Sequence, residues 1–313
     1  MTNIRNYIVV TAAYWGFTLT DGALRMLVLL HFHTLGYSPF ELATLFLLYE
    51  LMGVLTNLIG GWLGSRFGVK LTLLSGLALQ VFSLFLLSFL NPLWSAIFSL
   101  VFVLFAQGLS GVAKDLSKMS SKSAIKFVVP KSNHSTLFKL VALLTGSKNA
   151  LKGVGFFLGG VLLSVCGFVY ALWIMAGALF ALLILSGWLL PNSMGKASTK
   201  AKIKEIFSKS RPINILSMAR VFLFGARDVW FVVALPVFLL SELNWNFKVV
   251  GGFLALWIIG YGIVQSLAPS LVKSSEDGHS KELKYASAWM VICLLYTSPS
   301  PRDMRRSRMP SSA

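Results

Sequence analysis

Lys148 and Lys152 lie four residues apart within the apolar segment 137–165. At a rise of about 1.5 Å per residue, a helix over this segment places them about 16 and 22 Å along its axis, near the middle of a bilayer. Residues spaced i,i+4 share one face of a helix, where like charges repel. The pattern therefore favours a multiply charged anion that bridges the two ammonium groups. Alternatively, each lysine pairs with an acid on another helix, such as Glu50 or Asp228.

Three arginines also lie within apolar segments: Arg25, Arg220 and Arg227. A guanidinium offers two parallel N–H donors to two oxygens, which suits a phosphate or arsenate group. Arg227 lies about 21 Å into its segment and Arg25 about 27 Å, whereas Arg220 is nearer the inner mouth. We predict that these arginines and the two lysines bind an anionic substrate. For Arg25 the alternative is an i,i+4 pair with Asp21.

The acids within apolar segments are Asp21, Glu50 and Asp228. A charge at the centre of a membrane helix costs about 2.5–3.5 kcal/mol on insertion scales, so we expect each of these acids to have a partner or a function. These carboxylates either pair with buried cations or carry a coupling proton, because burial disfavours the charged form of an acid. The buried cations outnumber the buried acids, which indicates an anionic ligand.

Signals for a metal site, a cofactor or an enzyme are poor. His31 and His33 point about 200° apart on a helix, so they do not converge on a metal. Cys166 and Cys293 form no thiolate cluster, so soft chelation of trivalent arsenic is unsupported. We find no nucleophile–base–acid set, phosphate-cradling glycine loop or ATP motif. We therefore predict no metal, no cofactor and no enzymatic activity.

The composition of the chain indicates which kind of secondary structure holds these charges. Of the 313 residues, 56% are hydrophobic and 12% charged, and the mean hydropathy is +0.75. Soluble chains carry about 25% charged residues, so we predict an all-α, polytopic membrane protein in contact with lipids. The net charge of +17 would by itself suggest nucleic acid. A chain this apolar has little water-exposed surface for such a partner, so we predict none.

A membrane-spanning helix needs about 20 predominantly apolar residues. No cleavable signal peptide is evident before the first such stretch. A further stretch begins at Tyr285 but stops at Tyr296, short of a bilayer core. The stretches that qualify are 7–32, 38–60, 71–90, 93–113, 137–165, 167–190, 213–240 and 249–272.

The basic residues in the connections and near the segment ends fall mostly on one side of the membrane. Lys248 alone lies on one side, and the opposite side holds the set named below, so the positive-inside rule predicts a cytoplasmic N-terminus. The lysines that recur every four residues from Lys114 to Lys126 are explained by anionic-lipid contact or orientation. The alternative is an electrostatic funnel for anionic substrate. The inner set is Arg5, Arg66, Lys70, Lys114, Lys118, Lys122, Lys126, Lys131, Lys139, Lys196, Lys200, Lys202, Lys204, Lys209, Arg211, Lys273, Lys281 and Lys284.

A weak internal repeat pairs segment 7–32 with 213–240, with Asp21 opposite Asp228. It predicts two six-helix halves related by a parallel repeat. The final stretch lacks periodicity, and we expect a chain truncated after about eight and a half helices that ends in foreign sequence; the alternative is a disordered basic tail. The predicted parts are an N-terminal half at 1–190, a Lys-rich cytoplasmic linker at 191–212, a partial C-terminal half at 213–296 and a non-native tail at 297–313.

The turn after segment 38–60 reads GWLGSRFGVK. It resembles the loop signature G-x-L-x-D-R-x-G-R-K/R of the major facilitator superfamily, with Ser65 where that signature has an acid. The run GFFLGG at 155–160 is similar to the G-P-x-x-G-G end of the antiporter signature, with Phe156 in place of proline; close helix packing explains such a run equally well. The resemblance implies a gating loop that includes Gly61, Gly64, Arg66, Gly68 and Lys70.

Longer strings at 22–50, 111–126, 143–160 and 223–239 resemble the organoarsenical-efflux permeases of bacterial arsenic-resistance operons (ArsJ type). That resemblance implies a twelve-helix permease of the bacterial inner membrane that confers arsenate resistance. Its substrate would be 1-arseno-3-phosphoglycerate, the unstable ester that glyceraldehyde-3-phosphate dehydrogenase makes from arsenate. The alternatives are a permease for another organophosphate or a drug, and a non-transporting membrane sensor or scaffold.

Overall fold

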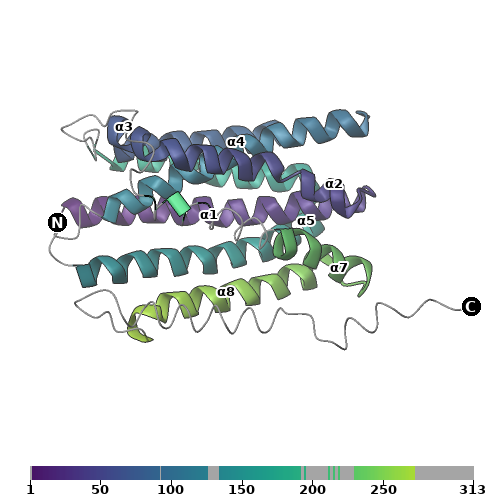
Figure 1. Ribbon diagram of the computed structural model, residues 1–313. Coiled ribbons are helices and arrows are strands. Elements are labelled where there is room, and N and C mark those ends of the chain that lie inside the picture. The colour runs from purple at the N-terminus through teal and green to yellow at the C-terminus, as the bar shows by residue number, and fades with distance from the viewer. Residues whose placement is uncertain are drawn as a thin grey trace, which may run out of the picture. The chain divides into compact units, whose positions relative to one another are not determined.

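The computed structural model describes residues 2–91, 93–125, 134–191, 194, 211, 214–215, 218 and 229–271. These residues form an all-α protein, with no strand in the part described (Figure 1). Contacts divide the chain into two compact units, Met1–Ser266 and Leu267–Ala313, and the packing below concerns the first. The elements are α1 (Thr2–Thr34), α2 (Pro39–Thr44), α3 (Leu47–Leu87), α4 (Ala96–Ile125), α5 (His134–Leu189), the π-helix η2 (Val229–Ala234), α7 (Leu235–Ser241) and α8 (Phe247–Leu271).

Two of these helices bend sharply at a glycine. α5 has 56 residues, which would reach about 84 Å if straight, far more than a bilayer core. Gly167, with φ 77° and ψ 179°, divides it into two helical segments, and Gly68, with φ 83° and ψ 170°, divides α3 in the same way. A positive φ is a conformation that glycine adopts readily. The breaks match the predicted joins between 38–60 and 71–90 and between 137–165 and 167–190.

Five segments are long and apolar enough to cross a membrane, by length and composition. α1 has a similar length, but Asp21, Arg25 and several buried threonines lower its hydropathy. The predicted segment 93–113 falls largely within α4, which continues to Ile125 along the extension that carries the lysines from Lys114 onward. The five segments are Phe40–Asn57, Arg66–Leu87, Ala96–Ile125, Lys139–Leu189 and Phe247–Leu267.

Small residues let α1 and α5 pack closely. A Cβ added at Gly155 would clash with the carbonyl oxygen of Leu19, and one at Gly159 with that of Ala23. Such contacts are typical of membrane helix crossings. They agree with the packing explanation of the glycine run at 155–160.

The interface between α3 and α4 carries buried hydroxyl groups. Ser120 Oγ donates to Thr72 Oγ1 at 2.8 Å, and Ser110 Oγ donates to Gln80 Oε1 at 2.7 Å. Hydrogen bonds between helices contribute to association in lipid, where the hydrophobic effect does not drive helices together.

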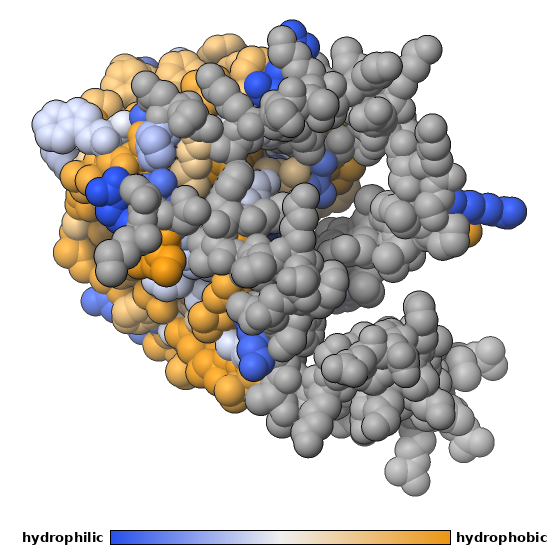
Figure 2. All heavy atoms as spheres, turned by 90° about the vertical axis from the view of Figure 1, so that its left-hand side faces the viewer, coloured by the Kyte–Doolittle hydropathy of each residue, from blue (hydrophilic) through white to orange (hydrophobic). Residues whose placement is uncertain are grey.

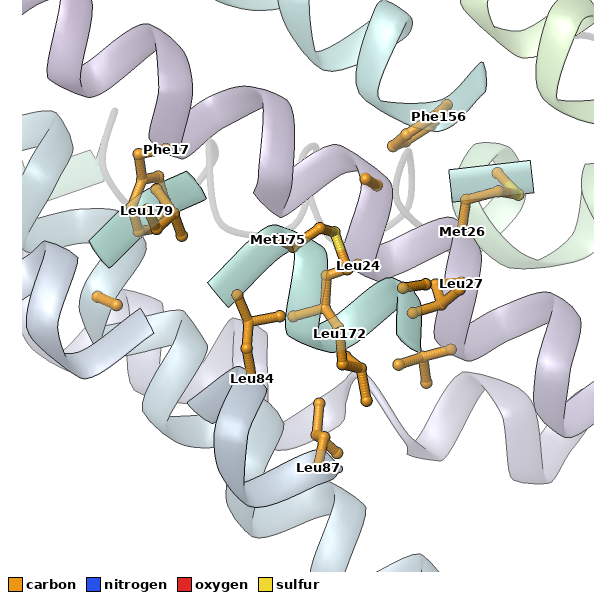
Figure 3. Close-up of a cluster of buried hydrophobic side chains, with 14 of the residues drawn as sticks. Phe17, Leu24, Met26, Leu27, Leu84, Leu87, Phe156, Leu172, Met175 and Leu179 are labelled. Carbon is orange, nitrogen blue, oxygen red and sulfur yellow. The ribbon is translucent and has the colours of Figure 1, made fainter. Parts of the chain in front are cut away.

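The apolar side chains of this unit face both inward and outward. Figure 3 shows Leu24 of α1, Leu84 of α3 and Met175 of α5 among the buried side chains that meet between these helices. Leu93 and Trp188 are 90% and 86% exposed, and apolar atoms dominate the described part of the face in Figure 2. Exposed apolar surface of this extent marks a membrane-facing or partner-facing protein.

Candidate functional site

An ion-pair cluster joins α1, α3 and α4. Arg25 Nη2 donates to Glu50 Oε1, and Lys114 Nζ donates to Glu50 Oε2 at 3.3 Å. The side chains of Arg25, Lys114 and Glu50 are 3%, 23% and 38% exposed. One carboxylate therefore bridges two cations from two other helices, and it is the most exposed member of the three.

Tyr49 connects this ion-pair cluster to Asp21. The Arg25 guanidinium carbon lies 4.2 Å from the centroid of the Tyr49 ring, and Lys114 Nζ lies 4.1 Å from it. Both distances are within the range of cation–π attraction. The Tyr49 hydroxyl, fully buried, donates to Asp21 Oδ1 at 2.5 Å. We call Asp21, Arg25, Tyr49, Glu50 and Lys114 the charge cluster.

Gly53 makes room for this cluster one helical turn after Glu50. A Cβ at Gly53 would lie 2.8 Å from Asp115 Oδ2 and 3.3 Å from Lys114 Nζ. The missing side chain therefore lets the charged groups of α4 lie against α3.

A second group of cations surrounds a small cavity between α1, α4 and α5. Its volume of about 30 Å³ exceeds the minimum needed to admit water. Lys118 forms an i,i+3 ion pair with Asp115 at 2.7 Å, whereas Lys148 forms no ion pair with any residue that the structure describes. We call it the lysine cavity; its lining residues are Tyr14, Lys118, Lys122, Leu144, Thr145 and Lys148.

Lys152 lies one turn from Lys148 along α5. Its Nζ is 5.8 Å from the centroid of the Phe156 ring. Glu50, a predicted partner for these lysines, is engaged by Arg25 and Lys114.

The structure brings together some predicted site residues and leaves others outside its described part. Arg25 pairs with Glu50 on another helix, and Asp21 accepts a hydrogen bond from Tyr49. The remaining predicted residues, Arg220, Arg227 and Asp228, lie outside the described residues.

The lipid-contact interpretation of the lysine ladder was wrong for Lys114 and Lys118. Each forms an ion pair with an acid, Glu50 or Asp115, because α4 continues along α3 beyond the predicted segment end. Lys122 lines the lysine cavity, and Lys126 lies outside the described residues. Sequence reasoning also missed Tyr49, whose position next to Glu50 carries no signal by itself.

The predicted gating loop turns at a single residue. Gly61, Gly64 and Arg66 belong to the helical part of α3, and the direction changes at Gly68. Lys70 Nζ then donates to Leu190 O at 2.6 Å. A cation at the C-terminal end of α5 complements the helix dipole there. The loop therefore contacts the C-terminal end of α5.

Within the described part of the chain, no group of three His, Cys, Asp or Glu side chains is placed to hold a metal ion. Cys166 is a free thiol, and Cys293 lies outside the described residues.

Apolar helices that enclose ionisable groups define a multi-pass membrane protein, and such groups mark substrate or ion pathways. The chain belongs to the Major Facilitator Superfamily, whose family model matches residues 7–298. Membership of this family points to a membrane-embedded secondary transporter rather than to an enzyme. No curated protein matches the sequence.

Proposed function

We propose that this transporter exports an anionic organoarsenical, 1-arseno-3-phosphoglycerate. The observation that carries the anionic part is Lys148, which lies at a cavity with Lys118 and Lys122 and has no acidic partner among the described residues. A cation removed from water is costly unless it is paired. A bound oxyanion supplies that pairing.

The particular substrate rests on the resemblance of four sequence strings to organoarsenical-efflux permeases. The ester carries a phosphate group and an arsenate group, so it suits a site with several cations. In this proposal Lys148, Lys152 and Arg25 bind the ester from within the described part of the chain, and Arg220 and Arg227 complete the site. The two halves then rock to release it outside.

The proposed setting is a bacterial inner membrane with the N-terminus in the cytoplasm. Glyceraldehyde-3-phosphate dehydrogenase would supply the ester on that side. Asp21, Glu50 and Asp228 either pair with the cations or carry a coupling proton.

The deciding experiment uses the full-length protein in everted membrane vesicles. Arsenate, glyceraldehyde 3-phosphate, NAD and the dehydrogenase are supplied, and arsenic accumulation is measured. We expect accumulation that requires the dehydrogenase and exceeds that of vesicles without the transporter. Accumulation that does not depend on the dehydrogenase would contradict the ester and point to free arsenate.

The site is tested in the same vesicles with a Lys148→Ala, Lys152→Ala double variant. We expect arsenic uptake to fall at least about tenfold, because a charge-assisted pair with the substrate is lost. The matched control, Lys139→Ala with Lys248→Ala, removes the same charge from two exposed positions and should retain uptake. Preserved uptake in the first variant would remove these lysines from the site, whereas the absence of uptake by the unaltered protein would favour a non-transporting role.

An organophosphate permease is the second candidate, because the same cations accept a phosphate ester without arsenic. Uptake of radiolabelled 3-phosphoglycerate into the vesicles, with no arsenate present, distinguishes it from the first. A cationic drug is disfavoured, because the lysine cavity holds three cations.

A further inference from the structure

We propose that the Glu50 carboxylate occupies the place of a substrate oxyanion group between Arg25 and Lys114, and that the substrate displaces it. Glu50 would thus be a resident counter-ion rather than a permanent structural partner. The inference rests on the proposed function only in that the substrate is an anion.

The two donors match an oxyanion in their geometry. Arg25 and Lys114 each donate to a different oxygen of one carboxylate. A phosphate or arsenate group also offers two oxygens on one centre, so it can accept both hydrogen bonds in the same way. The donors come from α1 and α4, and the carboxylate comes from α3.

The donors are held in place when the carboxylate leaves. The Arg25 side chain is 3% exposed, and its guanidinium carbon lies 4.2 Å from the ring centroid of Tyr49 and 5.9 Å from that of Phe46. Lys114 lies against the same tyrosine ring. Preorganised donors bind a ligand more tightly, because less ordering is needed on binding.

Glu50 is the member of the three that can move. Its side chain is 38% exposed, against 3% for Arg25 and 23% for Lys114. A partly exposed carboxylate regains water when it leaves its partners, which lowers the cost of the exchange. Without a substrate, Glu50 offsets the charge of the two cations within the membrane.

The exchange predicts that Glu50 competes with anionic ligands. The test titrates the purified full-length protein, in lipid nanodiscs at fixed ionic strength, with 3-phosphoglycerate by calorimetry. The variant Glu50→Gln keeps the side-chain shape and removes the competing charge. We expect its affinity for 3-phosphoglycerate to rise about tenfold, because the ligand no longer displaces a charged partner.

The matched control is Glu41→Gln, the same substitution at an exposed acid before α3. It should change the affinity less than about threefold, because Glu41 accepts hydrogen bonds from Ser38 and does not contact the two donors. An equal rise in both variants would contradict displacement and indicate a general effect of charge. A weaker affinity in Glu50→Gln would overturn the proposal outright.

Two further variants keep the test decisive. In the double variant Glu50→Gln, Lys114→Gln the affinity should return to the wild-type value or below, since one of the two donors is gone. If Glu50→Gln does not fold, Glu50→Asp keeps the charge on a shorter side chain that reaches both donors less well. A higher affinity in Glu50→Asp then supports displacement, and an unchanged or lower one contradicts it.

This outcome is separable from that of the arsenic experiment, because the titration contains no arsenic. Suppose that Glu50→Gln binds 3-phosphoglycerate more tightly but vesicles accumulate no arsenic. The displacement of Glu50 is then supported, and the proposed substrate changes to an organophosphate. If arsenic uptake is confirmed and the affinity does not rise, only the role of Glu50 is lost.

Discussion

At the scale of single residues, Tyr49 has two separate functions in the charge cluster. Its ring contacts two cations, and its hydroxyl donates to the buried carboxylate of Asp21. A carboxylate removed from water needs such donors. Tyr49 therefore contacts one acid through its hydroxyl and two cations through its ring.

Tyr49→Phe separates these two functions. The ring and its cation contacts remain, but the buried Asp21 carboxylate loses a donor, which should cost about 1–3 kcal/mol of stability. The measurement is the midpoint of thermal unfolding in detergent. Tyr170→Phe removes a hydroxyl from a side chain that is 71% exposed, and it should leave the midpoint unchanged. An equal shift in both variants would mean that the Asp21 contact contributes nothing.

The sequence revealed Arg25, Glu50 and Lys148 because a charge within an apolar segment is costly wherever its partner lies. It did not reveal that Glu50 pairs with Arg25 and Lys114, because that depends on how α1, α3 and α4 are packed. Lys114 was assigned to the membrane surface for the same reason. Gly53 is uncharged and belongs to no periodic sequence pattern, so the sequence did not indicate its close contact with α4.

At the scale of elements, glycines with a positive φ shape the long helices. Gly167 and Gly68 each interrupt a continuous run of apolar helix, and both lie at joins between segments predicted from the sequence. The four-residue spacing of the lysines indicated that α4 extends beyond residue 113, but it did not reveal their partners. Hydropathy falls at Lys114, and the helix continues with Lys114 and Lys118 paired to acids.

Gly167→Ala tests whether the conformation at the break is required. No atom lies within 4 Å of an added Cβ there, so the cost arises from φ 77° and ψ 179° alone, about 1–3 kcal/mol. Gly177 also has open space around it but lies in regular helix, where alanine should stabilise by about 1 kcal/mol. Thermal unfolding of the two variants should therefore shift in opposite directions. A shift in the same direction would show that the break at Gly167 is not conformationally demanding.

At the scale of the whole molecule, the charge separates into two populations. The first population consists of the cations that form ion pairs or line the lysine cavity. They lie between helices, where we propose that an anionic ligand binds. Many of the remaining lysines and arginines fall in the connections predicted from the sequence, where the positive-inside rule predicts that they set the orientation, because cytoplasmic loops of membrane proteins carry an excess of these residues. The large net charge of the chain therefore says more about how it inserts than about what it binds.

Orientation can be measured with two single-cysteine variants in a Cys166→Ser, Cys293→Ser background. Leu93→Cys lies at a position that is 90% exposed in the connection predicted to face outward, and Lys139→Cys lies at an exposed position in the first turns of α5. A membrane-impermeant maleimide should label Leu93→Cys in intact cells, and Lys139→Cys only after permeabilisation. The reason is that the basic connections stay in the cytoplasm while the connection at Leu93, poor in Lys and Arg, crosses the membrane. The reverse pattern would invert the orientation and turn the proposed exporter into an importer of the same class of anion.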